Sequence, residues 1–222
     1  METVNEQMRE RVYRAERKPG EATYKAVTAG SVIEALGGIG VVALGIIGLA
    51  GVIPGVLAPI AAIAFGVALA AEGSAVASRY AQLTHYGNGA IEKTEIGGGV
   101  GSEVLGGVAG VVLGILALIG IAPIVLVSVA VVTFGAALLL GAGSTARLGS
   151  MIASVSHSLA SDTVTGSAGA EVLVGLGAIT LGIIALTGMH PMTLNLIGLL
   201  VLGAGALIEG AAVGGSMMAV WR

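Results

Sequence analysis

Five glutamates stand at the edges of long apolar stretches, and they are the side chains in this chain with the most chemical potential. Acidic residues within membrane helices are candidates for function, because a carboxylate in lipid is costly to bury. Carboxylates that lie close together share protons or supply oxygen ligands to a hard cation. The sequence therefore predicts a cation- or proton-binding layer made of Glu34, Glu72, Glu103, Glu171 and Glu209.

Three of these glutamates also have a structural interpretation. Glu34, Glu103 and Glu171 are each predicted in the first turn of a helix, where a negative side chain interacts favourably with the helix dipole. Ser31 and Glu34 have the spacing of a capping box. For these three residues helix capping is therefore an alternative to a binding role.

Glu72 and Glu209 are predicted well inside their helices, where capping does not explain them. For this pair the alternatives are a functional site and a structural charge pair. Arg79 follows Glu72 by seven residues, or two helical turns. That spacing is too long for a pair within one helix, but Arg79 could reach a neighbouring helix.

Other patterns that carry chemistry are missing from the sequence. The chain has no Cys, which excludes disulfides, thiolate metal sites and Cys nucleophiles. His85, His157 and His190 lack metal-ligand spacing, and a surface or loop role is expected for each. The formal net charge of -3 gives no case for nucleic acid. We expect no enzyme activity, no catalytic residues and no cofactor.

The elements that position the glutamates are long charge-free stretches. No Asp, Glu, Lys or Arg lies between Glu34 and Glu72, between Glu103 and Arg147, or between Glu171 and Glu209. Each gap holds two spans of roughly 20 residues. Charged residues make up 10% of the chain, against about 25% in a soluble domain. The sequence predicts an all-α integral membrane protein with six transmembrane helices in contact with lipid.

The three stretches align without gaps. A proline follows Glu34, Glu103 and Glu171 by 20 residues, and a glycine follows them by 32 residues. The matched residues are Pro54, Pro123 and Pro191, and Gly66, Gly135 and Gly203. The alignment predicts three tandem helical hairpins with a pseudo-threefold internal repeat. The predicted parts are a polar N-terminal segment (1–29), hairpins at 30–79, 101–147 and 170–222, and linkers at 80–100 and 148–169.

Small residues fall on one face of the first helix in every predicted hairpin, and that face includes the glutamate. Such stripes let membrane helices approach closely. The predicted packing residues are Gly38, Gly45, Gly107, Gly110, Gly114, Gly175 and Gly182. We therefore expect each glutamate to point at another helix. The middle hairpin has Gly141 where the other two have Glu72 and Glu209, so special chemistry is expected in the first and third hairpins.

The basic residues predict the topology. All ten Lys and Arg residues are expected at one face of the protein. That face should be the cytoplasmic face of the inner (plasma) membrane, so both termini are expected in the cytoplasm. The polar side chains of mid-membrane are Ser128, Thr133 and Thr180, and such hydroxyls usually bond back to their own helix. No polar path across the bilayer is expected.

Residues 107–118 (GVAGVVLGILAL), followed by Pro123, Phe134, Gly135 and Gly141, resemble the short membrane repeats of HdeD-like proteins. The resemblance covers the apolar hairpins only, and the regular glutamates and long inner linkers depart from that pattern. It implies a six-helix bacterial inner-membrane protein associated with acid stress. It carries over no catalytic residues.

Two functions follow from these observations. The first is a structural or accessory subunit that packs through its glycine faces into an oligomer or a larger membrane complex. The second is a proton or cation conduit or binding protein that uses the glutamate layer. Binding of a lipid or a quinone between the helices is a further alternative.

Overall fold

A computed structural model describes residues 33–86, 93–155 and 159–219 of the chain, with side chains at 33–74, 101–143 and 169–210. These described residues form helices and short turns, with no strand among them. The helices are a first helix (Ile33–Leu49), α2 (Pro54–Tyr86), α3 (Lys93–Leu118), α4 (Pro123–Val155), α5 (Leu159–Leu186) and α6 (Pro191–Ala219). By length and composition, α2 to α6 are each able to cross a membrane, and the first helix is a shorter apolar helix. The prediction of an all-α chain is confirmed for these residues, and the five long apolar helices fit a multi-pass membrane protein.

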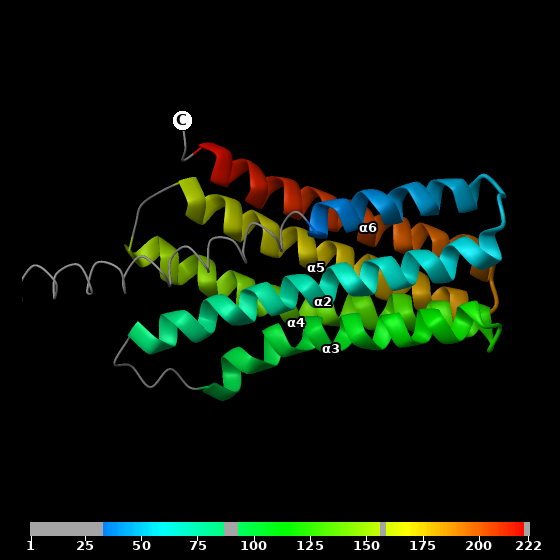
Figure 1. The fold of residues 1–222 in the computed structure, drawn as a ribbon, viewed down its shortest axis with the longest axis horizontal. Coiled ribbons are helices and arrows are strands. Elements are labelled where there is room, and N and C mark those ends of the chain that lie inside the picture. Colours follow the sequence, from blue (N-terminus) through cyan, green and yellow to red (C-terminus); the bar gives the residue numbers. More distant parts are fainter. Residues whose placement is uncertain (1–32, 87–92, 156–158, 220–222) are drawn as a thin grey trace, which may run out of the picture.

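The helices run side by side along the long axis of the molecule, and three tight turns lie together at one end (Figure 1). Each turn is closed by a glycine in the left-handed region: φ is 90° at Gly51, 94° at Gly120 and 89° at Gly188. In the first turn Gly51 N–H donates to Gly48 O (3.0 Å) and Val52 N–H donates to Ile47 O (3.3 Å). This pair of bonds is the Schellman motif, which ends a helix by satisfying its last carbonyls.

The turn prolines begin the returning helices. Pro54, Pro123 and Pro191 are the first residues of α2, α4 and α6. A missing N–H costs nothing at the start of a helix, where the N–H has no partner within the helix. Each outgoing helix ends two residues before its turn glycine, at Leu49, Leu118 or Leu186. The residue before each proline also has a positive φ, namely Ile53 (33°), Ala122 (38°) and His190 (42°).

Two of the three glutamates predicted at helix starts are far from them. Because α3 begins at Lys93 and α5 at Leu159, Glu103 lies ten residues and Glu171 twelve residues after the first residue of its helix. The helix-dipole interpretation is therefore wrong for both. The helices extend through much of the predicted linkers 80–100 and 148–169, since polar residues there continue the helical backbone. Ser31, the predicted cap for Glu34, lies outside the described residues.

Glycine pairs join the helices into a closed ring. A Cβ on Gly66 would stand 2.6 Å from the carbonyl oxygen of Gly107, so the backbones of α2 and α3 touch. The same kind of contact joins α4 to α5 and α6 to the first helix. The pairs are Gly66 with Gly107, Gly135 with Gly175, and Gly203 with Gly38. The last helix thus packs on the first, as Figure 1 shows for the red and orange helix beside the blue one.

The remaining glycines of the predicted stripes also contact helices of the same chain. A Cβ on Gly45 would stand 3.3 Å from Leu200 Cβ, and one on Gly114 would stand 2.7 Å from Ile63 Cγ1. A Cβ on Gly182 would stand 2.6 Å from Val132 Cγ2, and Gly110 lies against the ring of Phe134. The predicted packing glycines are therefore used inside the bundle.

The core of the bundle is apolar and includes one aromatic pair. The rings of Phe65 and Phe134 meet edge to face, with centroids 4.9 Å apart. Both side chains are buried, as are those of Leu196, Leu199 and Leu202. The outer surface is also apolar, with Leu36 63%, Leu105 72% and Leu173 73% exposed. A surface of this kind matches lipid rather than water.

Candidate functional site

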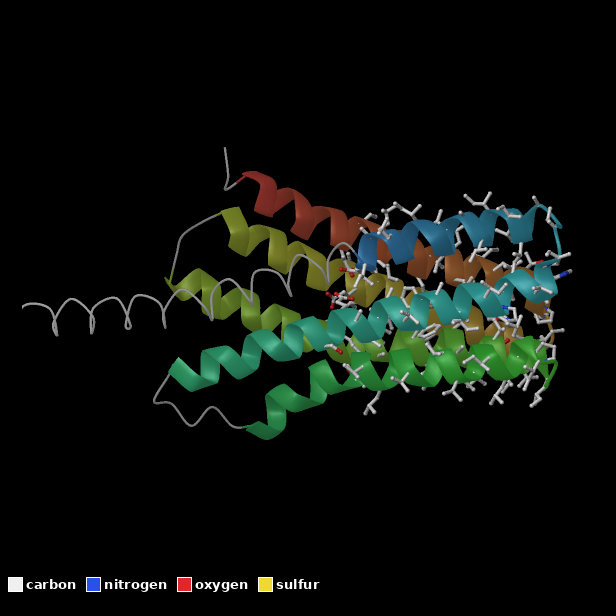
Figure 2. All side chains as sticks on the ribbon, in the orientation of Figure 1. Carbon is white, nitrogen blue, oxygen red and sulfur yellow. The ribbon has the colours of Figure 1, made fainter. Side chains whose placement is uncertain are left out.

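Three glutamates from three helices converge inside the bundle. Glu34 of the first helix, Glu72 of α2 and Glu209 of α6 each present a carboxylate oxygen, and these oxygens lie within 4.8 Å of one another. We call these residues the glutamate triad. Glu34 is 3% exposed and Glu209 7% exposed, while Glu72 is half-buried. Figure 2 shows side-chain oxygens gathered at this level of the bundle, at one end of the region with drawn side chains.

Small residues next to the triad bring its helices together. Gly38, one turn after Glu34, contacts Gly203 of α6, and a Cβ on Gly38 would stand 2.7 Å from Leu207 N. A Cβ on Gly37 would stand 2.7 Å from the Cβ of Ala68, one turn before Glu72 in α2. Larger side chains at these positions would hold the helices apart. The stripes therefore set the distances between the three carboxylates.

A cavity of about 10 Å³ adjoins the triad. All three glutamates line it, and apolar residues of α2, α4 and α6 form the rest of its wall. These residues are Phe65, Ala68, Leu69, Leu138, Leu202, Gly205 and Ala206. A space of this size holds about one water molecule. The cavity has room for one small ligand in direct contact with carboxylate oxygens.

One carboxylate oxygen of the triad, on Glu34, makes no hydrogen bond within the described part of the chain. Within the described part of the chain, Oε1 of Glu34 is buried and has no hydrogen-bond partner. A buried polar atom without a partner costs about 1–3 kcal/mol, and more when it is charged. Since Glu34 also lines the cavity, its oxygen is available to a ligand held there.

Glu103 and Glu171 flank the triad but do not belong to it. Both side chains are buried, at 4% and 5% exposure. The carboxylate of Glu103 lies against Gly141 of α4, in the space that a Cβ there would take. Both residues are close enough to Glu209 for electrostatic interaction. The predicted layer of five glutamates thus divides into a triad and two flanking carboxylates.

The hydroxyls of mid-membrane bond back to their own helices, as predicted. Ser128 Oγ donates to Ile124 O (2.9 Å), Thr133 Oγ1 donates to Val129 O (2.8 Å) and Thr180 Oγ1 donates to Leu176 O (2.8 Å). Each acceptor lies four residues before its donor. These hydroxyls are therefore committed to the backbone and line no polar route.

Asn195 is a polar residue close to the third turn, yet its side chain is fully buried between helices. Its Nδ2 donates to Ile124 O of α4 (3.2 Å), and Oδ1 has no partner among the described residues. Asn195 shares the buried side of α6 with Leu196 and Leu199.

Some predicted participants lie outside the described side chains, namely Arg79, His85 and His157. The charge pair considered between Arg79 and a neighbouring helix therefore stays a prediction. The role of Gly141 as a recess for Glu103 was not foreseen. The feature of the sequence that could have indicated this recess is the glycine at the position where the other two stretches carry a glutamate.

Comparison with protein-family models, with curated proteins and with solved structures finds no match to this chain. No family is assigned. What the protein does must therefore follow from the triad and from the bundle that holds it.

Proposed function

We propose that this protein is a non-enzymatic multi-pass membrane protein that binds positive charge, as a cation or as protons, at the glutamate triad. The proposal rests on one observation: three carboxylates from three helices converge on one small buried cavity. Carboxylates so close in a low-dielectric site repel one another and are poorly solvated unless something neutralises them. A bound cation or shared protons would neutralise them.

Binding, rather than conduction across the bilayer, is the proposed role. Between the triad and the turns, the buried side chains of the described interior are almost all apolar, and the Phe65–Phe134 pair is among them. The polar exceptions there are Ser128, whose hydroxyl bonds back to its own helix, and Asn195, which lies near the turns. Transporters line their sites with midplane polar groups or broken helices. We expect proteoliposomes to show no pH- or cation-driven dye response above that of empty vesicles.

The proposed architecture has six spans, arranged as three hairpins about a pseudo-threefold axis. Three turns with nearly equal φ values support it. Three glycine pairs at matched positions of the sequence alignment also support it. So do Leu36, Leu105 and Leu173, which occupy one matched position and are similarly exposed.

The proposed topology places both termini in the cytoplasm and the three turns outside the inner membrane. Support comes from the one-sided distribution of Lys and Arg, and the resemblance to HdeD-like proteins implies the same membrane. The chain has no Cys, so single cysteines report topology directly. Val52→Cys and Met189→Cys at the exposed turns should react with a membrane-impermeant maleimide on intact cells. Thr3→Cys should react only after permeabilisation, and the reverse pattern would invert the topology.

The proposed function is tested by comparing charge binding in lipid nanodiscs. The test protein carries Glu34→Gln, Glu72→Gln and Glu209→Gln together, and the matched control carries Glu103→Gln with Glu171→Gln. Proton uptake on acidification and thermal stabilisation by a panel of cations are measured for each. The wild type and the control should respond in at least one assay, and the test protein should respond in neither. Equal responses from all three proteins would overturn the proposal.

A second candidate function is the accessory subunit. The glycine stripes that suggested an accessory role contact helices of the same chain. Gly40 and Gly177, by contrast, contact no other helix of the described structure. A Cβ on Gly40 or on Gly177 would meet no atom within 4 Å in the described structure. These outward small residues would admit another membrane helix. Native mass after mild detergent extraction tests this candidate: a complex should form, and Gly40→Leu with Gly177→Leu should dissociate it.

A further inference from the structure

We propose that the ligand of the glutamate triad is a single divalent cation of the size of Ca²⁺, held directly by carboxylates of Glu34, Glu72 and Glu209. This inference rests on the proposed function and names its ligand. Four observations carry it: the spacing of the oxygens, the volume of the cavity, the unused oxygen of Glu34 and the charge of the site.

The oxygen spacing is compatible with an ion of the size of Ca²⁺. Three oxygens no more than 4.8 Å apart leave a central point at most about 2.8 Å from each of them. Ca²⁺ binds oxygen at about 2.3–2.6 Å, whereas Mg²⁺ requires about 2.0–2.1 Å. At that upper limit of the spacing, Ca²⁺ would need a smaller inward adjustment of the three side chains than Mg²⁺ would.

The cavity volume points to an ion that has lost most of its water. About 10 Å³ accommodates one water molecule at most. Three bidentate carboxylates would supply six oxygens without any water, at the lower end of the range of six to eight that Ca²⁺ takes. Mg²⁺ usually retains several waters, for which this cavity has no space. A site of carboxylate oxygens alone also selects hard cations over softer metals.

Oε1 of Glu34 adds an observation beyond the closeness of the three carboxylates. Glu34 is 97% buried, given its 3% exposure, and it lines the cavity. Within the described residues this oxygen accepts no hydrogen bond. A cation in the cavity would supply the partner that the surrounding side chains do not. The other walls near it are carbon atoms of Phe65, Leu69 and Leu202.

The charge of the site favours a divalent ion over a monovalent one. Three ionised carboxylates carry three negative charges, and a monovalent cation would leave two of them uncompensated in an apolar site. A divalent cation leaves one, and Coulomb attraction in a low-dielectric site grows with ionic charge. Glu103 and Glu171 add to the negative potential without entering the ligand set.

The test uses the full chain in nanodiscs, stripped of metal with a chelator and dialysed against CaCl₂, MgCl₂ or KCl. Bound metal is counted by atomic absorption, and thermal unfolding is followed in parallel. We expect one Ca²⁺ per chain, with Mg²⁺ and K⁺ at least about tenfold weaker. Glu34→Gln, Glu72→Gln and Glu209→Gln should each weaken Ca²⁺ binding by at least about tenfold, and Glu103→Gln, which changes only the surrounding potential, should weaken it clearly less than any of them.

Unfolding in chelator serves as the folding check, because the Gln variants remove repulsion between carboxylates and should be at least as stable as the wild type. Equal binding of Mg²⁺ or K⁺, or Ca²⁺ binding that survives all three substitutions, would overturn this inference. If no metal binds but proton uptake depends on the triad, the inference fails and the proposed function stands. If neither occurs, both fail.

Discussion

The carboxylate of Glu103 occupies the space that a Cβ atom on Gly141 would need. Gly141 stands where the other two aligned stretches carry Glu72 and Glu209. The absence of a side chain there gives Glu103 a recess away from the triad. The relationship accounts for one of the two glutamates that lie beside the cluster of three and not in it.

Gly141→Ala should therefore destabilise the protein. The new methyl group meets the Glu103 carboxylate, and overpacking of this kind costs about 1–3 kcal/mol. Gly143→Ala is the matched control on the same helix, since a Cβ there meets no atom within 4 Å. The control should be neutral or gain up to about 1 kcal/mol, because Ala favours a helix over Gly. Reversible unfolding in mixed micelles measures both, and equal stability of the two variants would contradict the recess.

The glycine pairs that close the ring should be intolerant of any side chain. Gly38→Ala would place a methyl group 2.7 Å from Gly203 O and Leu207 N, and Gly175→Ala would place one 2.7 Å from Gly135 O. Backbone atoms cannot rotate away, so each change should cost about 1–3 kcal/mol. Gly40→Ala is the control on the first helix and Gly177→Ala the control on α5, and both should be harmless. A loss at the control positions equal to that at Gly38 and Gly175 would show that the helix faces are assigned wrongly.

The left-handed glycines of the turns should resist replacement for a different reason. Gly120 has φ of 94°, and an L residue in a left-handed conformation costs about 1–2 kcal/mol. Gly120→Ala should lower stability by that amount, although a Cβ there has open space around it. Gly55→Ala, also in open space but without a positive φ, should not. Thermal unfolding compares the two, and an unaffected Gly120→Ala variant would argue against this turn geometry.

At Asn195, unlike at the glycines above, a substitution should leave stability unchanged or increase it. Asn195→Leu removes a buried Oδ1 that has no partner among the described residues, and it leaves Ile124 O still bonded to Ser128 Oγ. Replacing a half-satisfied polar group by an apolar one of similar shape is nearly neutral or stabilising. The unfolding free energy of Asn195→Leu should lie within about 1 kcal/mol of the wild type or above it. A loss of several kcal/mol would indicate that Oδ1 holds a water or an ion.

The sequence predicted the all-α fold class, the position of each turn and the inward direction of the glutamates. All three follow from where charged residues, prolines and glycines fall along the chain. It misplaced the starts of α3 and α5. Polar residues such as Thr94 and Ser161 read as linker, yet they sit in helices that continue past the apolar stretch. Spacing along one helix could not tell which glutamates of different helices meet, since that depends on how the helices cross. Hence five candidates were predicted where Glu34, Glu72 and Glu209 form the cluster.

The contact between Gly203 and Gly38 has a consequence for the order of the chain. It joins the end of the chain to its beginning through the same aligned positions that join Gly66 to Gly107 and Gly135 to Gly175. In three dimensions no hairpin comes first. Under the proposed three-hairpin repeat, each hairpin carries one surface that its neighbour needs and one that needs its neighbour, as the subunits of a cyclic homotrimer do. A single polypeptide differs from such a trimer in one respect: one of three matched positions, Gly141, can differ from its two counterparts.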